Sequence, residues 1–123
     1  MEENRYERHF LLDGFGRDGQ EKLLNAKVLI VGVGGLGSPV AMYLASAGIG
    51  RLGLIDADVV DITNLQRQII HSESSVGVEK VVSAKQRIAD LNSETEVVTY
   101  DFFYDEKNAE SITKDYDFVV VNY

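Results

Sequence analysis

Short continuous runs of apolar residues alternate with amphipathic segments along most of the chain. Most of these runs are rich in β-branched or aromatic side chains, which is typical of strands in a covered sheet. These expected strands cover residues 27–32, 52–56, 96–100 and 117–121. The segments between them carry small apolar residues or apolar residues at helical spacing, which predicts helices. These expected helices cover residues 38–47, 79–91 and 108–114.

The alternation of strands with helices predicts an α/β fold, because parallel strands need a crossover connection between them. We expect a Rossmann-like, mostly parallel sheet with helices on both faces. In the usual strand order 3-2-1-4, the strand over residues 117–121 is an exposed edge with apolar faces. Such an edge invites pairing with another chain, so we expect an oligomer or aggregation. The long connection over residues 57–78 is too ordered in composition to be a linker.

The first 26 residues follow a different pattern, with apolar side chains near helical spacing from Tyr6 onward. We expect two short helices here, the second over residues 20–25 with Asp18 as its N-terminal cap. The sequence therefore divides into an N-terminal helical extension over residues 1–26 and a Rossmann-like domain over residues 27–123.

Composition narrows the class of protein. The chain of 123 residues is 45% hydrophobic, which supports one buried core. Its formal net charge of −8 argues against nucleic acid as a partner, because phosphate backbones need a positive surface. The chain has no cysteine, which excludes a disulfide scaffold and a thiolate zinc site and fits a reducing cytoplasm. No apolar run approaches the about 20 residues of a membrane-spanning helix, so we expect a soluble, cytoplasmic protein with no membrane partner.

A glycine-rich turn follows the first expected strand, reads Gly32-Val33-Gly34-Gly35-Leu36-Gly37 and matches the pattern G-x-G-x-x-G. Glycine lets main-chain N–H groups approach an anion, and the following helix adds partial positive charge. Asp56 lies nineteen residues after Gly37, where a carboxylate accepts hydrogen bonds from ribose hydroxyls. The pattern predicts a ligand that is a nucleotide with a ribose, and it does not distinguish NAD from ATP. A tight turn without a ligand is the alternative.

Three polar residues after the second expected strand favour a nucleoside triphosphate, namely Asn64, Arg67 and Lys80. A triphosphate carries more negative charge than a dinucleotide, so it needs extra cations, most of all when a second anion attacks the α-phosphorus. Arg67 can hold phosphate oxygens in a bidentate fork, and Lys80 can act as a point charge. The alternatives are a structural ion pair for Arg67 and a solvated helix face, shared with Lys85 and Arg87, for Lys80.

With these residues in place, the sequence resembles the ThiF/MoeB/HesA family, the prokaryotic relatives of ubiquitin-activating enzymes. The resemblance covers residues 5–98 in the family's order and spacing, and the match looks closest to the sulfur-carrier adenylyltransferases of thiamin and molybdopterin biosynthesis. The stretches that carry it are Arg5-Tyr6-Glu7-Arg8, Val31-Gly32-Val33-Gly34-Gly35-Leu36-Gly37-Ser38, Leu44-Ala45-Ser46-Ala47-Gly48-Ile49-Gly50, Asp56-Ala57-Asp58, Asn64-Leu65-Gln66-Arg67-Gln68 and Gly77-Val78-Glu79-Lys80.

The resemblance implies an enzyme, a nucleotidyltransferase that binds ATP with Mg2+. The family adenylates the C-terminal glycine of a ubiquitin-like sulfur carrier protein and releases pyrophosphate. The resemblance also implies a homodimer in which Arg8 reaches the phosphates from the partner subunit, so that Arg8, Arg67 and Lys80 carry the catalysis. The residues that it assigns to the nucleotide are Gly32, Gly34, Gly35, Leu36, Gly37, Asp56, Asp58, Asn64, Gln66, Arg67 and Lys80.

This chemistry needs no general base, because the attacking carboxylate is already ionised. Catalysis then consists mainly of positioning and charge neutralisation while pyrophosphate leaves in line. The lack of a catalytic histidine or cysteine is therefore no objection, and we interpret His9 and His71 as surface or packing residues.

The sequence departs from the family at its end. Members of the family close the fourth strand with an aspartate-rich turn that binds magnesium, whereas Val121 stands here where aspartate is usual. The next expected aspartate falls just past Tyr123, so no metal ligand is assigned within the chain. The family's second half, with its carrier-binding surface, a zinc site in many members and any sulfur-handling cysteine, is absent. We expect the front half of a larger protein, with little or no adenylyltransferase activity alone.

Other functions stay open. A noncatalytic nucleotide-binding and dimerisation module is favoured by the missing magnesium aspartate and opposed by the intact Arg8, Arg67 and Lys80. An enzyme like the tRNA threonylcarbamoyladenosine dehydratase, built on the same scaffold, is opposed by the acidic charge and by residues 64–68. An NAD dehydrogenase is a weaker rival, because nothing resembles a hydride-transfer site. The carrier and the pathway are not identified by the sequence.

Overall fold

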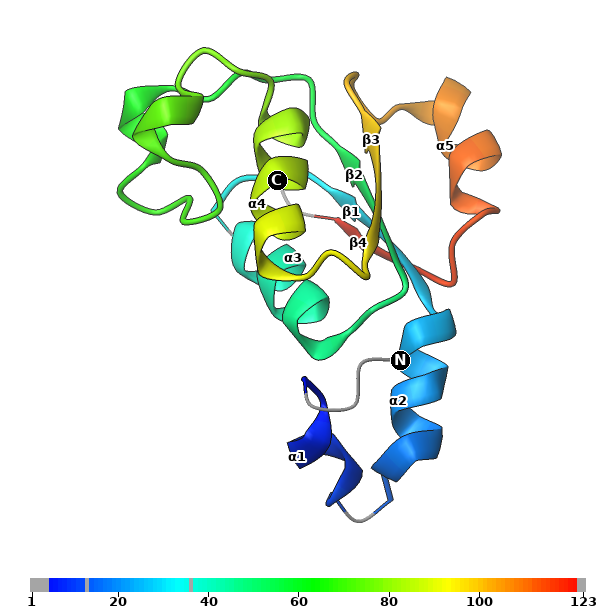
Figure 1. The fold of residues 1–123 in the computed structure, drawn as a ribbon. Helices are drawn as coiled ribbons and strands as arrows, with labels where there is room; N and C mark the ends of the chain where they lie inside the picture. The colour runs from blue at the N-terminus through cyan, green and yellow to red at the C-terminus, as the bar shows by residue number, and fades with distance from the viewer. Residues whose placement is uncertain (1–4, 13, 36, 122–123) are drawn as a thin grey trace.

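A parallel sheet forms the centre of the protein. The computed structural model describes residues 5–12, 14–35 and 37–121, with only the backbone of Phe10. The four strands pair in parallel in the order β3-β2-β1-β4 (Figure 1). They are β1 (Lys27–Val31), β2 (Arg51–Ile55), β3 (Glu96–Tyr100) and β4 (Phe118–Val121). The strand order expected from the sequence is confirmed.

Helices cover both faces of this sheet, as the sequence predicts. On one face, Ile30 of β1 and Ile88 are fully buried in the larger apolar cluster. On the other face, Leu29 of β1 packs in a smaller cluster with Ile112. Because β1 is covered on both sides, its sequence is a continuous apolar run. The helices that provide this cover are α3 (Gly37–Ala47) and α4 (Lys80–Leu91) on the first face and α5 (Glu106–Thr113) on the second.

The connection between β2 and α4 is ordered, as its composition predicts. It contains two short 3-10 helices, η1 (Ile62–Asn64) and η2 (Glu73–Ser75). Its two ends are joined by main-chain hydrogen bonds, since the Val60 N–H donates to the Val78 carbonyl at 2.8 Å and the Gly77 N–H donates to the Val60 carbonyl at 2.8 Å. The connection therefore folds back so that the start of α4 lies beside the end of β2.

The N-terminal extension forms α1 (Glu7–Phe10) and α2 (Gly16–Asn25). The second helix begins earlier than residue 20, and the expected cap at Asp18 is wrong. The helix starts after Phe15, which provides no side-chain cap. Asp18 lies inside the first turn, where its carboxylate faces the positive end of the helix dipole. The ring of Phe15 packs over Gly19, where an added Cβ would lie 2.6 Å from a ring carbon.

Buried polar contacts attach this extension to the sheet domain. Tyr6 is 1% exposed, and its hydroxyl accepts from Asn92 Nδ2 at 2.8 Å and donates to Glu94 Oε2 at 3.2 Å. Gln20 is also fully buried, and its Nε2 donates to the Ala47 carbonyl at 2.8 Å. Ala47 ends α3, and Asn92 and Glu94 follow α4, so the extension lies below the edge at which the strands begin (Figure 1).

The last two elements differ in detail from the sequence-based expectation. α5 starts two residues early because Asp105 caps it, accepting from the Lys107 and Asn108 N–H groups. β4 is an edge strand, as expected, and its Phe118 is 65% exposed. Among the described residues, no helix is both long and apolar enough to cross a membrane.

Candidate functional site

The carboxyl ends of β1 and β2 form the base of the site. These strands are in parallel register, so Val31 lies opposite Ile55. The main chain then turns at Gly32, whose φ of +94° is a conformation that favours glycine. The Gly32 N–H donates to the Ile55 carbonyl at 2.8 Å. This bond places the glycine-rich turn directly beside the residue that follows β2.

That residue is Asp56, and its carboxylate joins the two strand ends. Oδ2 accepts from the Val33 N–H at 2.8 Å, and Oδ1 accepts from the Asp58 N–H at 2.9 Å. An ionised carboxylate has about four acceptor sites, so each oxygen keeps capacity for one further donor. A half-buried carboxylate held in this way is suited to the two hydroxyls of a ribose.

The glycine-rich turn presents bare main chain. A Cβ added at Gly35 would meet no atom within 4 Å, so open space lies there. Neither the Gly34 nor the Gly35 N–H donates to any described residue. α3 begins two residues later, and its dipole adds positive potential at this end. Leu36, which the sequence assigned to the nucleotide, lies outside the described residues.

Two buried polar atoms near the turn have no hydrogen-bond partner among the described residues. They are Ser38 Oγ in the first turn of α3 and Gln68 Oε1. The Gln68 amide also lies against Gly34, with Nε2 3.5 Å from the position of an added Cβ. Buried polar groups without partners are rare, so these two atoms favour a bound group at this place. Sequence analysis assigned neither residue to the site.

A pocket of about 220 Å³ adjoins Asp56. Three aromatic residues close one side of it, Phe102, Phe103 and Tyr104, while Asp56 and Asp58 supply its polar rim. Complete ligand sites measure about 300–1,000 Å³, so this pocket suits one end of a larger ligand. A planar base with its ribose fits such a place, with phosphates over the open turn.

Lys80 provides a cation beside this pocket. It is the first residue of α4, and its N–H donates to the Asp58 carbonyl at 2.9 Å. The residue is only 8% exposed, and its side chain forms no ion pair with any described residue. Lys85 and Arg87 are exposed, so a solvated helix face shared by the three does not describe Lys80. A lysine in so buried a position with no counter-ion among the described residues favours an anion as its partner.

The connection between β2 and α4 contains the other polar residues that the sequence assigns to the nucleotide. Arg67 is exposed, donates to the Thr63 carbonyl at 3.4 Å and forms no ion pair within the described part of the chain, so a structural ion pair does not explain it. Asn64 Oδ1 accepts from the Asp61 N–H at 2.8 Å, which gives Asn64 a capping role. Gln66 is exposed, with no side-chain hydrogen bond to a described residue.

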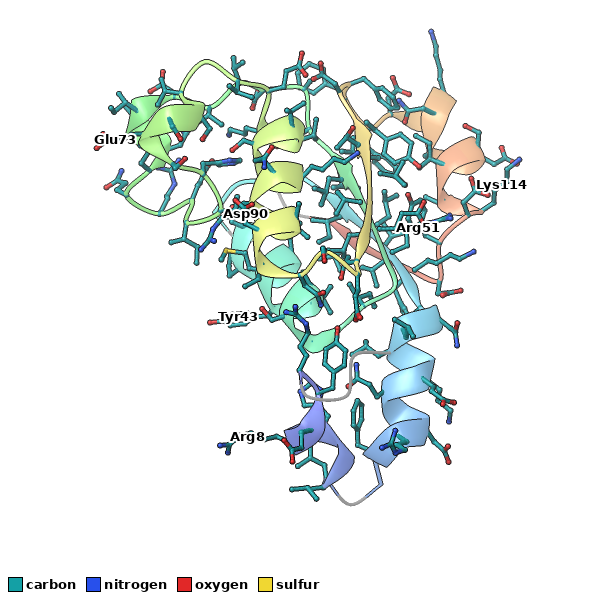
Figure 2. All side chains as sticks on the ribbon, viewed as in Figure 1. Arg8, Tyr43, Arg51, Glu73, Asp90 and Lys114 are labelled. Carbon is teal, nitrogen blue, oxygen red and sulfur yellow. The ribbon has the colours of Figure 1, made fainter. Side chains whose placement is uncertain are left out.

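Arg8 is not brought to this site. It lies on α1, below the starting edge of the sheet, and its side chain extends away from the body of the chain (Figure 2). The glycine-rich turn lies beyond the opposite edge, where β1 ends. The structure therefore separates Arg8 from Arg67 and Lys80 within one chain.

The described residues do not form a magnesium centre. No three histidine or acidic side chains among them are grouped closely enough to hold a metal ion. Glu79 and Asp101 form an acidic pair, in which the charge of Asp101 raises the pKa of Glu79, but two carboxylates do not complete a cation site. The described residues therefore offer no complete set of ligands for a magnesium ion.

His71 is a further buried residue of this region, and sequence analysis gave it only a packing role. It is 7% exposed, with Nδ1 2.7 Å from Ser83 Oγ and Nε2 3.1 Å from the Val33 carbonyl oxygen. Burial lowers its pKa from the ordinary value of 6.5, and the charge of Lys80 acts in the same direction. The hydrogen bond to Val33 and the charge of Asp56 act against this shift. The signal in the sequence that could have indicated a buried histidine is its position directly after Ile69 and Ile70.

A hollow of about 930 Å³ lies elsewhere, formed by the residues that join α1 to α2, by α2 itself and by Phe118 of β4. Leu11 and Leu12, which line it, are 80% and 56% exposed. This hollow is a broad groove with both apolar and charged side chains, and it lies at the edge where the strands begin, away from the glycine-rich turn. The smaller pocket at Asp56 is therefore the candidate site.

A comparison with protein families agrees with this assignment. The model that describes the ThiF family matches residues 6–122. The chain belongs to the ThiF family. This ThiF-family chain is 52% identical over 116 residues to the adenylyltransferase and sulfurtransferase MOCS3 of Dictyostelium discoideum, covering 94% of this chain and 27% of MOCS3. It is 44% identical over 116 residues to the probable adenylyltransferase/sulfurtransferase MoeZ of Mycobacterium tuberculosis, covering 94% of this chain and 30% of MoeZ.

The fold of this ThiF-family chain is also found in solved structures. The tRNA N6-threonylcarbamoyladenosine dehydratase TcdA of E. coli, in complex with ATP, matches with a TM-score of 0.90 at 33% identity. The match covers 98% of this chain and 49% of TcdA. The chain thus spans about a quarter to a third of the curated relatives and about half of this solved structure.

Proposed function

We propose that this chain is the nucleotide-binding part of an ATP-dependent adenylyltransferase of the ThiF family. One observation carries the proposal, which is the arrangement at the ends of β1 and β2. There the Asp56 carboxylate lines a pocket and accepts from the Val33 N–H of the glycine-rich turn, and the buried Lys80 is joined to Asp58 at the pocket rim by a main-chain hydrogen bond. We assign the ribose to Asp56 and the phosphates to the turn and to Lys80.

Charge supports ATP over NAD as the ligand. The turn alone suits a single pyrophosphate. Lys80 and Arg67 are two further cations without ion-pair partners among the described residues, and a triphosphate provides the charge that they lack. The names of MOCS3 and MoeZ, and the ATP bound to TcdA, point the same way.

The proposed reaction joins a carboxylate to AMP. A carboxylate oxygen attacks the α-phosphorus, the bond from that phosphorus to the bridging oxygen of the β-phosphate breaks, and pyrophosphate leaves with the electron pair. Two anions must approach each other, so Lys80 and Arg67 act by reducing their repulsion and by holding the triphosphate in line. No described residue needs to accept a proton.

The carboxylate substrate is the finer part of the proposal. We assign it to the C-terminal glycine of a ubiquitin-like sulfur carrier of the thiamin or molybdopterin type, because MOCS3 and MoeZ are named as adenylyltransferases that are also sulfurtransferases. We also propose that residues 1–26 form an extension and that residues 27–123 form the ATP-binding domain. We further propose that the protein is cytoplasmic.

A tRNA dehydratase is the second candidate, because TcdA shares the fold and binds ATP. The greater identity to MOCS3, 52% against 33%, favours the adenylyltransferase. A noncatalytic nucleotide-binding module would hold the phosphates with the same cations, so the binding site alone does not favour it over the enzyme.

Calorimetry tests the nucleotide. We expect ATP to bind and NAD to bind at least about tenfold more weakly. Arg67→Ala should weaken ATP binding about 10- to 100-fold, the usual effect of losing hydrogen bonds to a charged group. The control is Arg87→Ala, which removes the same charge from the exposed face of α4 and should leave the affinity within about twofold. Equal affinity for NAD, or an unchanged affinity in Arg67→Ala, would contradict the proposal.

Activity tests the extent of the enzyme. We propose that the 123 residues alone have little or no turnover. The measurement is pyrophosphate release with ATP, magnesium and a cognate carrier. A normal enzymatic rate from this chain would show that the described part already contains the full catalytic apparatus.

A further inference from the structure

His71 connects the interior of the protein to the glycine-rich turn. It follows the segment 64–68 but contributes nothing to the pocket itself. Its ring lies between Ser83 of α4 and the carbonyl of Val33, and all three residues are buried. We propose that His71 is a positioning residue that fixes the Val33–Gly34 peptide so that the Gly34 N–H faces the bound phosphates.

The hydrogen bonds define one form of the ring. A carbonyl oxygen can only accept, so Nε2 must carry the proton that is donated to Val33 at 3.1 Å. The neutral ring then has a bare Nδ1, which accepts from the Ser83 hydroxyl at 2.7 Å. The Val33 carbonyl therefore fixes the tautomer, and the Ser83 hydroxyl supports the ring in this position.

The planarity of the peptide transmits this contact to the next residue. In a trans peptide the carbonyl and the N–H point in opposite directions. When His71 holds the Val33 carbonyl inward, the Gly34 N–H must point away from the ring, toward the open side of the turn. That N–H has no acceptor among the described residues, which leaves it free for a phosphate oxygen.

Glycine makes such a restraint necessary. Rotating the Val33–Gly34 peptide by half a turn changes ψ of Val33 and φ of Gly34, and glycine accepts either sign of φ at little cost. Sterics alone therefore do not fix the direction of this N–H. The Val33 N–H is already held by Asp56 Oδ2 at 2.8 Å, so His71 adds the second restraint on the same residue.

This inference rests on the proposed nucleotide at the turn, and its test separates a phosphate effect from a loss of structure. We would measure ATP and adenosine binding to the wild-type chain and to His71→Phe. The phenyl ring fills the same space but donates no hydrogen bond. ATP affinity should fall about 10- to 100-fold, whereas adenosine affinity should change less than about threefold.

Two further variants keep the inference testable if His71→Phe folds poorly. His71→Gln places an amide N–H near the position of Nε2 and should recover most of the ATP affinity. Ser83→Ala keeps the ring but removes its support, and should weaken ATP binding about three- to tenfold. Thr95→Val is the matched control, because Thr95 is a buried residue whose hydroxyl donates to the Ile49 carbonyl at 2.9 Å, far along the chain from the turn.

The outcomes are distinct. Selective loss of ATP binding in His71→Phe, with recovery in His71→Gln and no change in Thr95→Val, supports the inference. Unchanged ATP affinity in His71→Phe and Ser83→Ala overturns it, as does an equal loss of ATP and adenosine binding. If the wild-type chain binds adenosine but gains nothing from the phosphates of ATP, the proposed function fails as well, which the wild-type titrations alone reveal.

Discussion

At the scale of single residues, Val33 occupies the most constrained position of the site. Its side chain is fully buried, its N–H is held by Asp56 and its carbonyl by His71. The proposed ribose carboxylate and the proposed phosphate-positioning ring thus act on the same main-chain residue. Because the two contacts hold different atoms of Val33, a change at His71 should act on the phosphates while the Asp56 contact keeps the ribose in place.

The titration of His71 gives a prediction for stability. Burial lowers the pKa of His71 below its ordinary value of 6.5, Lys80 adds to this, and Asp56 opposes it. The unfolded chain then holds the proton more tightly than the folded chain. The free energy of unfolding should fall as the pH decreases from about 6.5 through the folded pKa, by at most about 1.4 kcal/mol per pH unit for this group.

Urea unfolding between pH 7.5 and 5 measures this effect. Other groups titrate in both proteins, so the relevant quantity is the difference between the wild-type chain and His71→Gln. That difference should shrink as the pH falls. A difference that stays constant over this interval would show that His71 titrates alike in the folded and unfolded chain.

Some site residues could be predicted from the sequence because their chemistry depends on local pattern. Asp56 follows a strand, and the glycines follow another, so the parallel sheet brings them together. The burial of Lys80 could not be predicted, because Lys85 and Arg87 share its helix and only the folded connection distinguishes them. His71 and Ser83 lie twelve residues apart, and no local pattern pairs them.

At the scale of elements, the strands were predicted closely because each is a short apolar run. β3 begins and ends at the expected residues, and the ends of β1, β2 and β4 differ by one residue. Helix starts were harder, since they depend on capping. α5 begins at Glu106 because Asp105 and Asn108 form a reciprocal cap, a signal present in the sequence but not used. α2 begins without any side-chain cap, so only the packing of Phe15 on Gly19 places it.

At the scale of the whole molecule, the position of Arg8 bears on assembly. The extension is attached at the edge where the strands begin, so Arg8 is remote from the site of its own chain (Figure 2). We propose a homodimer in which Arg8 contacts the nucleotide of the partner subunit. The exposed edge strand β4 and the groove beside it, which Phe118 also lines, leave surface for such an association.

Concentration dependence tests this proposal. ATP affinity of the wild-type chain should rise as light scattering shows that two chains associate, because the second chain then supplies a cation. Arg8→Ala should abolish this rise and leave the affinity of the monomer unchanged. Lys85→Ala, which removes an exposed cation from α4 outside this groove, serves as the control. Weaker ATP binding by monomeric Arg8→Ala would instead indicate a contact within one chain.

The order of the strands has a consequence for folding during synthesis on the ribosome. β1 is the second strand from one edge, and its partner β4 lies near the other end of the sequence, so the contact of Lys27 with Asp117 closes a separation of 90 residues. Closing so long a segment is slow compared with local helix formation. β1 therefore keeps one side unpaired until β4 has been synthesised, and a molecular chaperone that recognises nascent extended segments should find its target at residues 27–31.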